Sequence, residues 1–181
     1  MLFEIKYLRI IIVLLGLSYK QAIVAQEGSY EISVPRLQES VKIDGVLSEE
    51  VWNSAASFSN FSQVEPKSFA KPSQKTEVRV FSTSSALYIG VKCFDTEPDK
   101  ILAKERRRDN PARGDDRVRI AFDTFGRGTN YYYLGVAGGG GKADGVVKAG
   151  SRPDLTWDTI WDCDTSLDSE GWYVEFEIPF R

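Results

Sequence analysis

The chain alternates apolar and polar residues with a period of two along much of its length after residue 30. Successive side chains of a strand point to opposite sides, so this alternation is typical of strands that bury one face. The pattern predicts six strands, at residues 30–34, 78–80, 87–93, 118–122, 132–136 and 172–178. Each apolar face must be buried against another layer. Turn-rich segments between short strands therefore favour an all-β fold, a two-sheet antiparallel β-sandwich of the immunoglobulin or jelly-roll kind.

One short helix is predicted ahead of the second strand. Ser48 is expected to be its N-cap, and the acidic Glu49 and Glu50 suit the positive end of the helix dipole. An apolar stripe that includes Val51 and Trp52 follows. A helix this short is not stable alone, so we expect it to dock on the sandwich through Trp52.

The first 25 residues have the order of a secretory signal peptide. Lys6 and Arg9 precede an apolar run at residues 10–17, and small residues lead up to Gln26. The run is too short to span a bilayer. We therefore predict a signal peptide at residues 1–25, one domain at residues 26–181, and export to the periplasm, the cell surface or outer membrane, or the medium. The alternative interpretation is a buried N-terminal strand or helix.

Composition excludes several classes of chemistry. The chain has no histidine, and its only methionine is Met1. This excludes Ser-His-Asp and Cys-His catalysis, His-ligated zinc, and haem held by His or Met. The formal net charge of −3 gives no general attraction to nucleic acid. Cys93 and Cys163 either form a disulfide in an oxidising compartment or serve as small apolar residues, and the sequence leaves both open.

The end of the sequence suggests a longer protein. Arg181 comes directly after the last predicted strand. A sandwich that ends on a bare strand leaves an unpaired edge, which folded proteins cover or charge. We therefore expect further strands, and a further domain, beyond Arg181.

Four stretches in order resemble the family 9 carbohydrate-binding modules, particularly those that open long exported bacterial proteins with a C-terminal domain of unknown function. They are residues 43–52, 76–91, 115–125 and 171–180. The resemblance covers residues 41–180 and implies a two-sheet β-sandwich, sugar binding and, often, bound calcium. It also implies a non-catalytic module, accessory to carbohydrate catabolism or glycoside hydrolysis by a linked domain. The alternative is a structural module that docks onto a C-terminal outer-membrane barrel or other partner domain and binds no sugar.

Aromatic residues are the candidates for sugar contact, because a ring face packs on the C–H face of a pyranose. The candidates in loops or on outward strand positions are Trp157, Trp161, Tyr131 and Tyr133. Trp157 has polar neighbours on both sides; a loop tryptophan folded over the sandwich edge explains it equally well.

The resemblance departs from the family at its binding residues. Where sugar-binding members have a stacking tryptophan, this chain has residues 110–114, with Ala112 in place of an aromatic residue. The family's acidic ligand corresponds to Arg119, and its hydroxyl-binding arginine corresponds to Tyr133. None of the family's binding roles is transferred to these positions, and the changes favour the docking alternative.

Carboxylates supply the remaining candidates. Asp115 and Asp116 are hard oxygen ligands suited to a structural calcium ion. No pair of acidic residues stands out by its spacing as glycosidase machinery, so we expect no catalysis within this chain. The basic cluster at residues 104–109 is interpreted as a solvated loop, with an anion-binding loop as the alternative.

Overall fold

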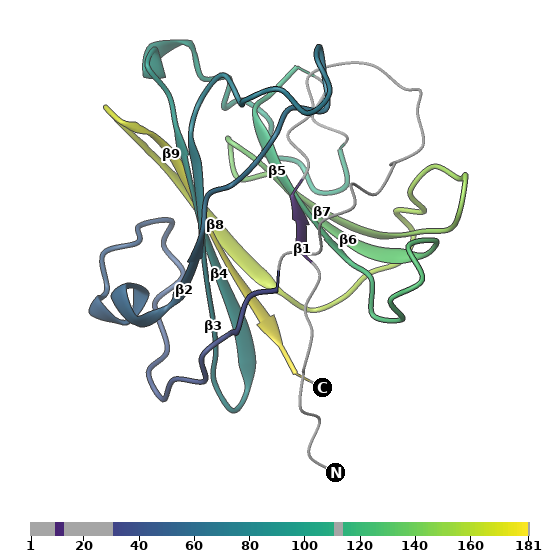
Figure 1. Cartoon of the computed structure of the whole chain (residues 1–181), viewed down its shortest axis with the longest axis horizontal. Coiled ribbons are helices and arrows are strands. Elements are labelled where there is room, and N and C mark those ends of the chain that lie inside the picture. The colour runs from purple at the N-terminus through teal and green to yellow at the C-terminus, as the bar shows by residue number, and fades with distance from the viewer. Residues whose placement is uncertain (1–9, 13–30, 111–113, 181) are drawn as a thin grey trace.

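The computed structural model describes residues 10–12, 31–110 and 114–180. Two antiparallel sheets face each other (Figure 1). The large sheet has the order β2-β3-β4-β9-β8, and the small sheet has the order β1-β5-β6-β7. Their bounds are β1 Ile10–Ile12, β2 Ala56–Phe58, β3 Thr76–Ser82, β4 Ala86–Phe94, β5 Arg117–Phe122, β6 Tyr131–Ala137, β7 Lys142–Val147, β8 Asp162–Asp168 and β9 Gly171–Pro179. The expected β-sandwich is confirmed.

The main core lies between the sheets and follows the alternation in the sequence. Ile89, Val91, Val118, Ile120 and Phe176 are all 0% exposed. The strands predicted at residues 78–80, 87–93, 118–122, 132–136 and 172–178 are confirmed as β3, β4, β5, β6 and β9. Burial of their apolar side chains is the main stabilising term of such a fold.

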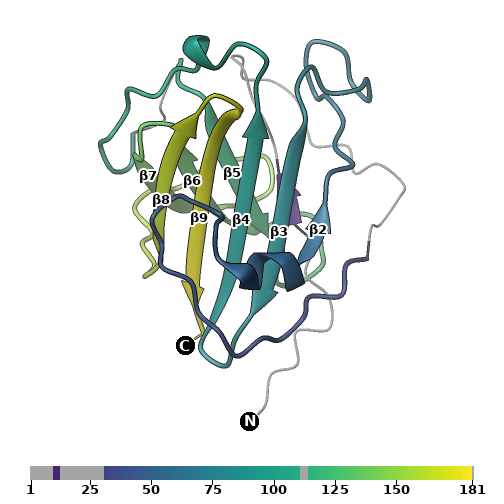
Figure 2. The same ribbon diagram turned by 90° about the vertical axis from the view of Figure 1, so that its left-hand side faces the viewer.

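A second, smaller core covers the outer face of the large sheet. Figure 2 shows a short helix, η1 (Glu50–Ser54), lying across β3 and β4. Trp52 is 1% exposed and packs edge-on against Phe81 at 5.0 Å, while Phe81 stacks on Tyr88 at 4.9 Å. The predicted docking through Trp52 is confirmed. A second helical turn, η2 (Pro98–Lys100), lies in the loop after β4.

The details of the predicted helix were wrong. η1 is a 3₁₀-helix, Glu49 occupies the N-cap position, and its side chain makes no capping hydrogen bond. The backbone N–H of Ser48 instead donates to the carbonyl of Val46. The tertiary contacts of Trp52, not a cap, hold this helix in place.

The strand predicted at residues 30–34 was also wrong over its described part, because residues 31–34 form no strand. Tyr30 lies outside the described residues. The segment pairs with the large sheet through an isolated parallel bridge between Arg36 and Ser82, and Val34 packs against the main core. Pro35 has no N–H to give a ladder, although its carbonyl accepts from the N–H of Ser82.

The position of the last strand corrects one argument from the sequence. β9 lies between β4 and β8 and pairs with both, so it is not a bare edge. Residues 10–12 of the predicted signal peptide form β1, which pairs with β5 from Ile10↔Phe122 to Ile12↔Ile120. Removal of the leader would therefore leave β5 at the edge of the small sheet. Cleavage and export stay predictions.

Two further sequence questions are resolved by the described residues. Cys93 is buried and Cys163 partly buried, and both are free thiols. Burial raises the pKa of each thiol to about 12. No helix in the described part of the chain has the length and apolar character to cross a membrane.

Candidate functional site

The outward face of β5, β6 and β7 carries the polar side chains that the core does not use. Val118, Ile120, Leu134 and Val136 enter the core, so their immediate neighbours in the strands point away from it. We call this surface the arginine–tyrosine face and define it by Arg117, Arg119, Tyr131, Tyr133, Gly135 and Ala143.

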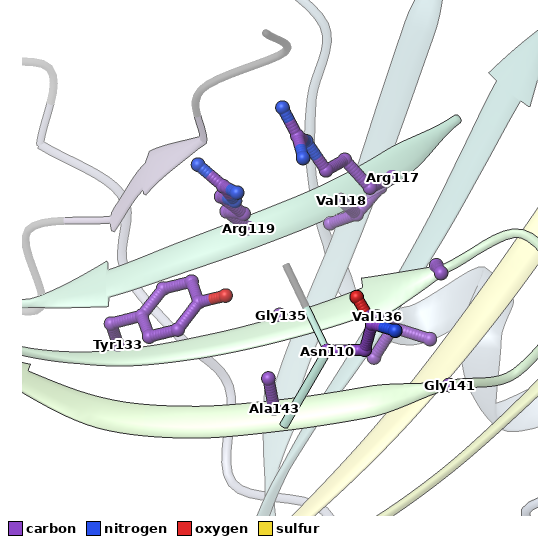
Figure 3. Close-up of a pocket in the computed structure, with 10 residues that line it drawn as sticks. Asn110, Arg117, Val118, Arg119, Tyr133, Gly135, Val136, Gly141 and Ala143 are labelled. Carbon is purple, nitrogen blue, oxygen red and sulfur yellow. The ribbon is translucent and has the colours of Figure 1, made fainter. Parts of the chain in front are cut away.

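The register of the strands creates a shallow hollow on this face. Arg119 is paired with Gly135, and Gly135 is paired with Ala143, so a row of small residues crosses β6 and β7 beside the arginine. The hollow is also lined by Arg117, Tyr133 and Asn110, and it is shallow, with about 10 Å³ of room for the centres of water-sized molecules. Figure 3 shows Arg117 and Arg119 projecting from β5 beside it.

Gly135 is needed because the Tyr133 side chain lies over it. A Cβ atom at position 135 would lie 2.6 Å from the Tyr133 hydroxyl oxygen. The ring points along β6 toward Gly135 in Figure 3. Tyr133 is 9% exposed and packs with Ala143 and Val147. It therefore forms a wall of the hollow more than an exposed stacking platform.

Positive charge dominates this hollow. The described residues that line it include two arginines and neither Asp nor Glu. The guanidinium carbon of Arg119 lies 5.6 Å from the centre of the Tyr133 ring, within cation–π range. Within the described part of the chain, the Nε of Arg119 is buried and has no hydrogen-bond acceptor. Burial raises the pKa of Tyr131, and the charge of Arg119 opposes that rise.

The structure separates the four aromatic candidates. Tyr131 and Tyr133 lie on the arginine–tyrosine face. Trp157 is half-buried and packs on Tyr132, which points to the opposite side of β6, at 4.9 Å. Trp161 is 4% exposed and stacks on Phe176 in the main core, so its ring has no open face for a sugar. Its selection as a candidate overlooked burial, which short-range sequence patterns do not reveal for a loop residue.

The two candidate calcium ligands bind backbone. Asp115 Oδ2 accepts hydrogen bonds from the N–H groups of Lys104 and Glu105, at 2.7 and 2.5 Å. Asp116 Oδ2 accepts from the N–H of Leu102 at 2.8 Å. These carboxylates thus hold the loop before β5 in place. Among the residues that the structure describes, no three His, Cys, Asp or Glu side chains group as metal ligands.

The basic cluster is only partly solvated, which corrects the loop interpretation for Arg108. Its Nη2 lies 2.6 Å from Asp144 Oδ1 and 2.7 Å from Asp158 Oδ1. Asp144 is 0% exposed and also accepts from the N–H of Thr159. The ion pair with Asp144 connects the loop to β7. The guanidinium of Arg108 is therefore already paired with carboxylates.

Sequence reasoning missed Arg117 and Asn110 as lining residues and treated Arg119 only as a departure from a pattern. Arg117 and Arg119 alternate with the core residues Val118 and Ile120, so the period of two does place both on one face. Nothing in the sequence places Asn110 beside them. Ala112 lies outside the described residues.

Two facing antiparallel sheets, with a polar hollow on one outer face, define a β-sandwich with a candidate binding surface. Residues 43–181 match the family described as "Carbohydrate family 9 binding domain-like". The match covers most of the chain, and the protein belongs to this family. Comparison with curated proteins found no match.

Solved structures share this fold. A family 9 carbohydrate-binding module from Caldicellulosiruptor kristjanssonii in complex with cellotriose is 20% identical, with a TM-score of 0.52 over 81% of this chain and 67% of that chain. The module in complex with glucose is 18% identical, with a TM-score of 0.52 over 80% and 69%. A protein from Bacteroides uniformis is 14% identical, with a TM-score of 0.60 over 81% and 71%.

Proposed function

We propose that this protein is a non-catalytic carbohydrate-binding module and that the arginine–tyrosine face is its saccharide site. Family membership over residues 43–181 supports the class of ligand, as do the similar structures in complex with cellotriose and glucose. The observation that carries the proposal is the hollow lined by guanidinium, amide and phenol groups on an outer sheet face of a member of this family.

The groups on this face suit a sugar ring. Arginine supplies N–H donors in a planar fork, and asparagine both donates and accepts, so these groups match the hydroxyls of a saccharide. Tyr131 is half-buried and offers apolar surface to C–H groups. Gly135 and Ala143 keep the floor low, so that a ring can approach the sheet.

We further propose that the module acts outside the cytoplasm, in the periplasm, at the cell surface or outer membrane, or in the medium. The charged, apolar and small segments of residues 1–25 support export. In this proposal it serves as an accessory to carbohydrate catabolism or glycoside hydrolysis by a linked domain.

One observation favours the docking alternative. Tyr133 is only 9% exposed and its ring contacts Arg119, so both side chains also have a structural explanation. A module that serves only to dock onto a partner domain would keep this packing and bind no saccharide.

A glycan array followed by calorimetry tests the proposal on the purified chain. We expect saccharide binding, and we expect Tyr131→Ala to weaken it roughly tenfold, or about 1.4 kcal/mol. Phe69→Ala is the control, because Phe69 is 59% exposed and lies in the loop between β2 and β3, two strands of the large sheet. If a folded chain binds no saccharide on the array, the docking alternative replaces this proposal.

A further inference from the structure

We propose that the arginine–tyrosine face selects saccharides that carry a negatively charged substituent, a carboxylate or a sulfate ester, and that Arg119 binds this group. The inference rests on the proposed function and names its class of ligand.

Arg119 differs in its charge environment from the three arginines that form ion pairs. Arg79 pairs with Glu77, Arg107 with Glu105, and Arg108 with Asp144 and Asp158. The recorded contact of Arg119 in the described part of the chain is the Tyr133 ring, and no carboxylate lines the hollow. Among the described residues, no carboxylate therefore neutralises the positive charge of Arg119.

In the part of the chain that the structure describes, one nitrogen of the Arg119 guanidinium is buried without a hydrogen-bond partner. The Nε of Arg119 is buried and meets no acceptor among the described residues. A buried donor without an acceptor lowers stability. Because this Nε has no open surface, a ligand oxygen meets the other N–H groups of the guanidinium. A neutral hydroxyl satisfies the hydrogen bond, whereas an anionic oxygen also compensates the charge and forms the stronger bond.

The residues around Arg119 position its guanidinium group and leave space in front of it. The Tyr133 ring lies beside it at 5.6 Å, and the paired residue Gly135 places no side chain in front of it. The planar fork of arginine matches carboxylate and sulfate oxygens two at a time. Arg117, two residues earlier on the same face of β5, also lines the hollow.

The charge of the whole chain argues against general attraction to polyanions. The formal net charge is −3, so positive potential at this face is local. We therefore expect the face to prefer only those anionic saccharides whose charged group can contact Arg119.

Calorimetry with three oligosaccharides of matched length tests the inference: one neutral, one containing uronic acid and one bearing sulfate. We expect at least one charged oligosaccharide to bind 10- to 100-fold more tightly than the neutral one, as a charge-assisted hydrogen bond provides. The two charged arms distinguish carboxylate from sulfate. Arg119→Gln should remove this preference, and Arg119→Lys should retain part of it.

Arg36→Gln is the matched control, because Arg36 is exposed and lies at the end of β3 in the other sheet. It should leave the preference unchanged. Thermal unfolding of each variant identifies any loss of fold, and the lysine variant retains the test if the glutamine variant unfolds.

The outcomes separate the two proposals. Neutral and charged oligosaccharides bound equally would overturn the inference and leave the proposed function standing. A preference that survives Arg119→Gln, or equal binding of inorganic polyphosphate, would also overturn the inference. No saccharide bound in any arm would overturn both.

Discussion

Glu175 is an acidic residue in the centre of the large sheet, and it links distant parts of the chain. It is 0% exposed. Its Oε2 accepts hydrogen bonds from the N–H groups of Asp44 and Gly45, at 2.9 and 2.8 Å, and its Oε1 accepts from Trp52 Nε1 at 3.2 Å. Burial raises the pKa of Glu175 to about 7, although the two backbone donors oppose the rise.

This raised pKa predicts a pH dependence of stability. The ordinary pKa of the group is 4.5, so the folded chain holds the proton more tightly than the unfolded chain between pH 4.5 and about 7. The contribution is therefore complete below pH 4.5 and is lost as the pH rises through 7. We expect the free energy of unfolding in urea to fall by about 3 kcal/mol over that range. Glu77 and Asp154 have a lowered pKa, so their effect on stability is confined to pH values below this range.

Glu175→Gln should remove this fall of the unfolding free energy with pH, because glutamine has no proton to lose between pH 4.5 and about 7. Glu97→Gln should keep it, since Glu97 is an exposed carboxyl with a side-chain exposure of 61%. A slope that persists unchanged in Glu175→Gln would assign the pH dependence to other groups.

At the scale of elements, the turn before η1 packs on the large sheet at Gly45. The backbone there has φ +79°, and a Cβ atom would lie 2.5 Å from the carbonyl carbon of Thr165 in β8. The hydroxyl of Ser166 also donates to the carbonyl of Gly45 at 2.6 Å. Only glycine fits this close approach of two backbones.

Gly45→Ala should therefore lower the free energy of unfolding by roughly 3 kcal/mol, measured by urea denaturation. Gly126→Ala is the matched control, because Gly126 has φ +64° and nothing within 4 Å of a Cβ atom. It should cost about 1 kcal/mol, the contribution of the left-handed conformation alone. Equal losses in both variants would show that the contact with Thr165 contributes nothing.

The sequence predicted the elements whose alternation reaches the main core and missed those without a clear apolar face. β8 consists largely of polar residues, and β7 contains Lys142, Asp144 and Gly145. β2 has only three residues. These strands are recruited by pairing with neighbours that are already placed, which local patterns do not encode. The cap of η1 was mispredicted for the same reason: contacts of Trp52 override local preference.

At the scale of the whole molecule, the sandwich and its family were predictable and the site only in part. Periodicity put Tyr131 and Tyr133 on one face, and it also contains the signal for Arg117 and Arg119. The burial of Trp161 depends on how the segment between β7 and β8 returns to the core, and the place of Asn110 depends on the path of a long loop. Both follow from the packing of the sheets rather than from local sequence.

The central claim is that saccharides bind on the outer face of the small sheet. NMR titration of the chain with the tightest-binding saccharide from the array tests it directly. We expect backbone amide shifts to concentrate at Arg117–Phe122 and Tyr131–Ala137, while β3 and β4 change little. Shifts confined to the large sheet would contradict this account.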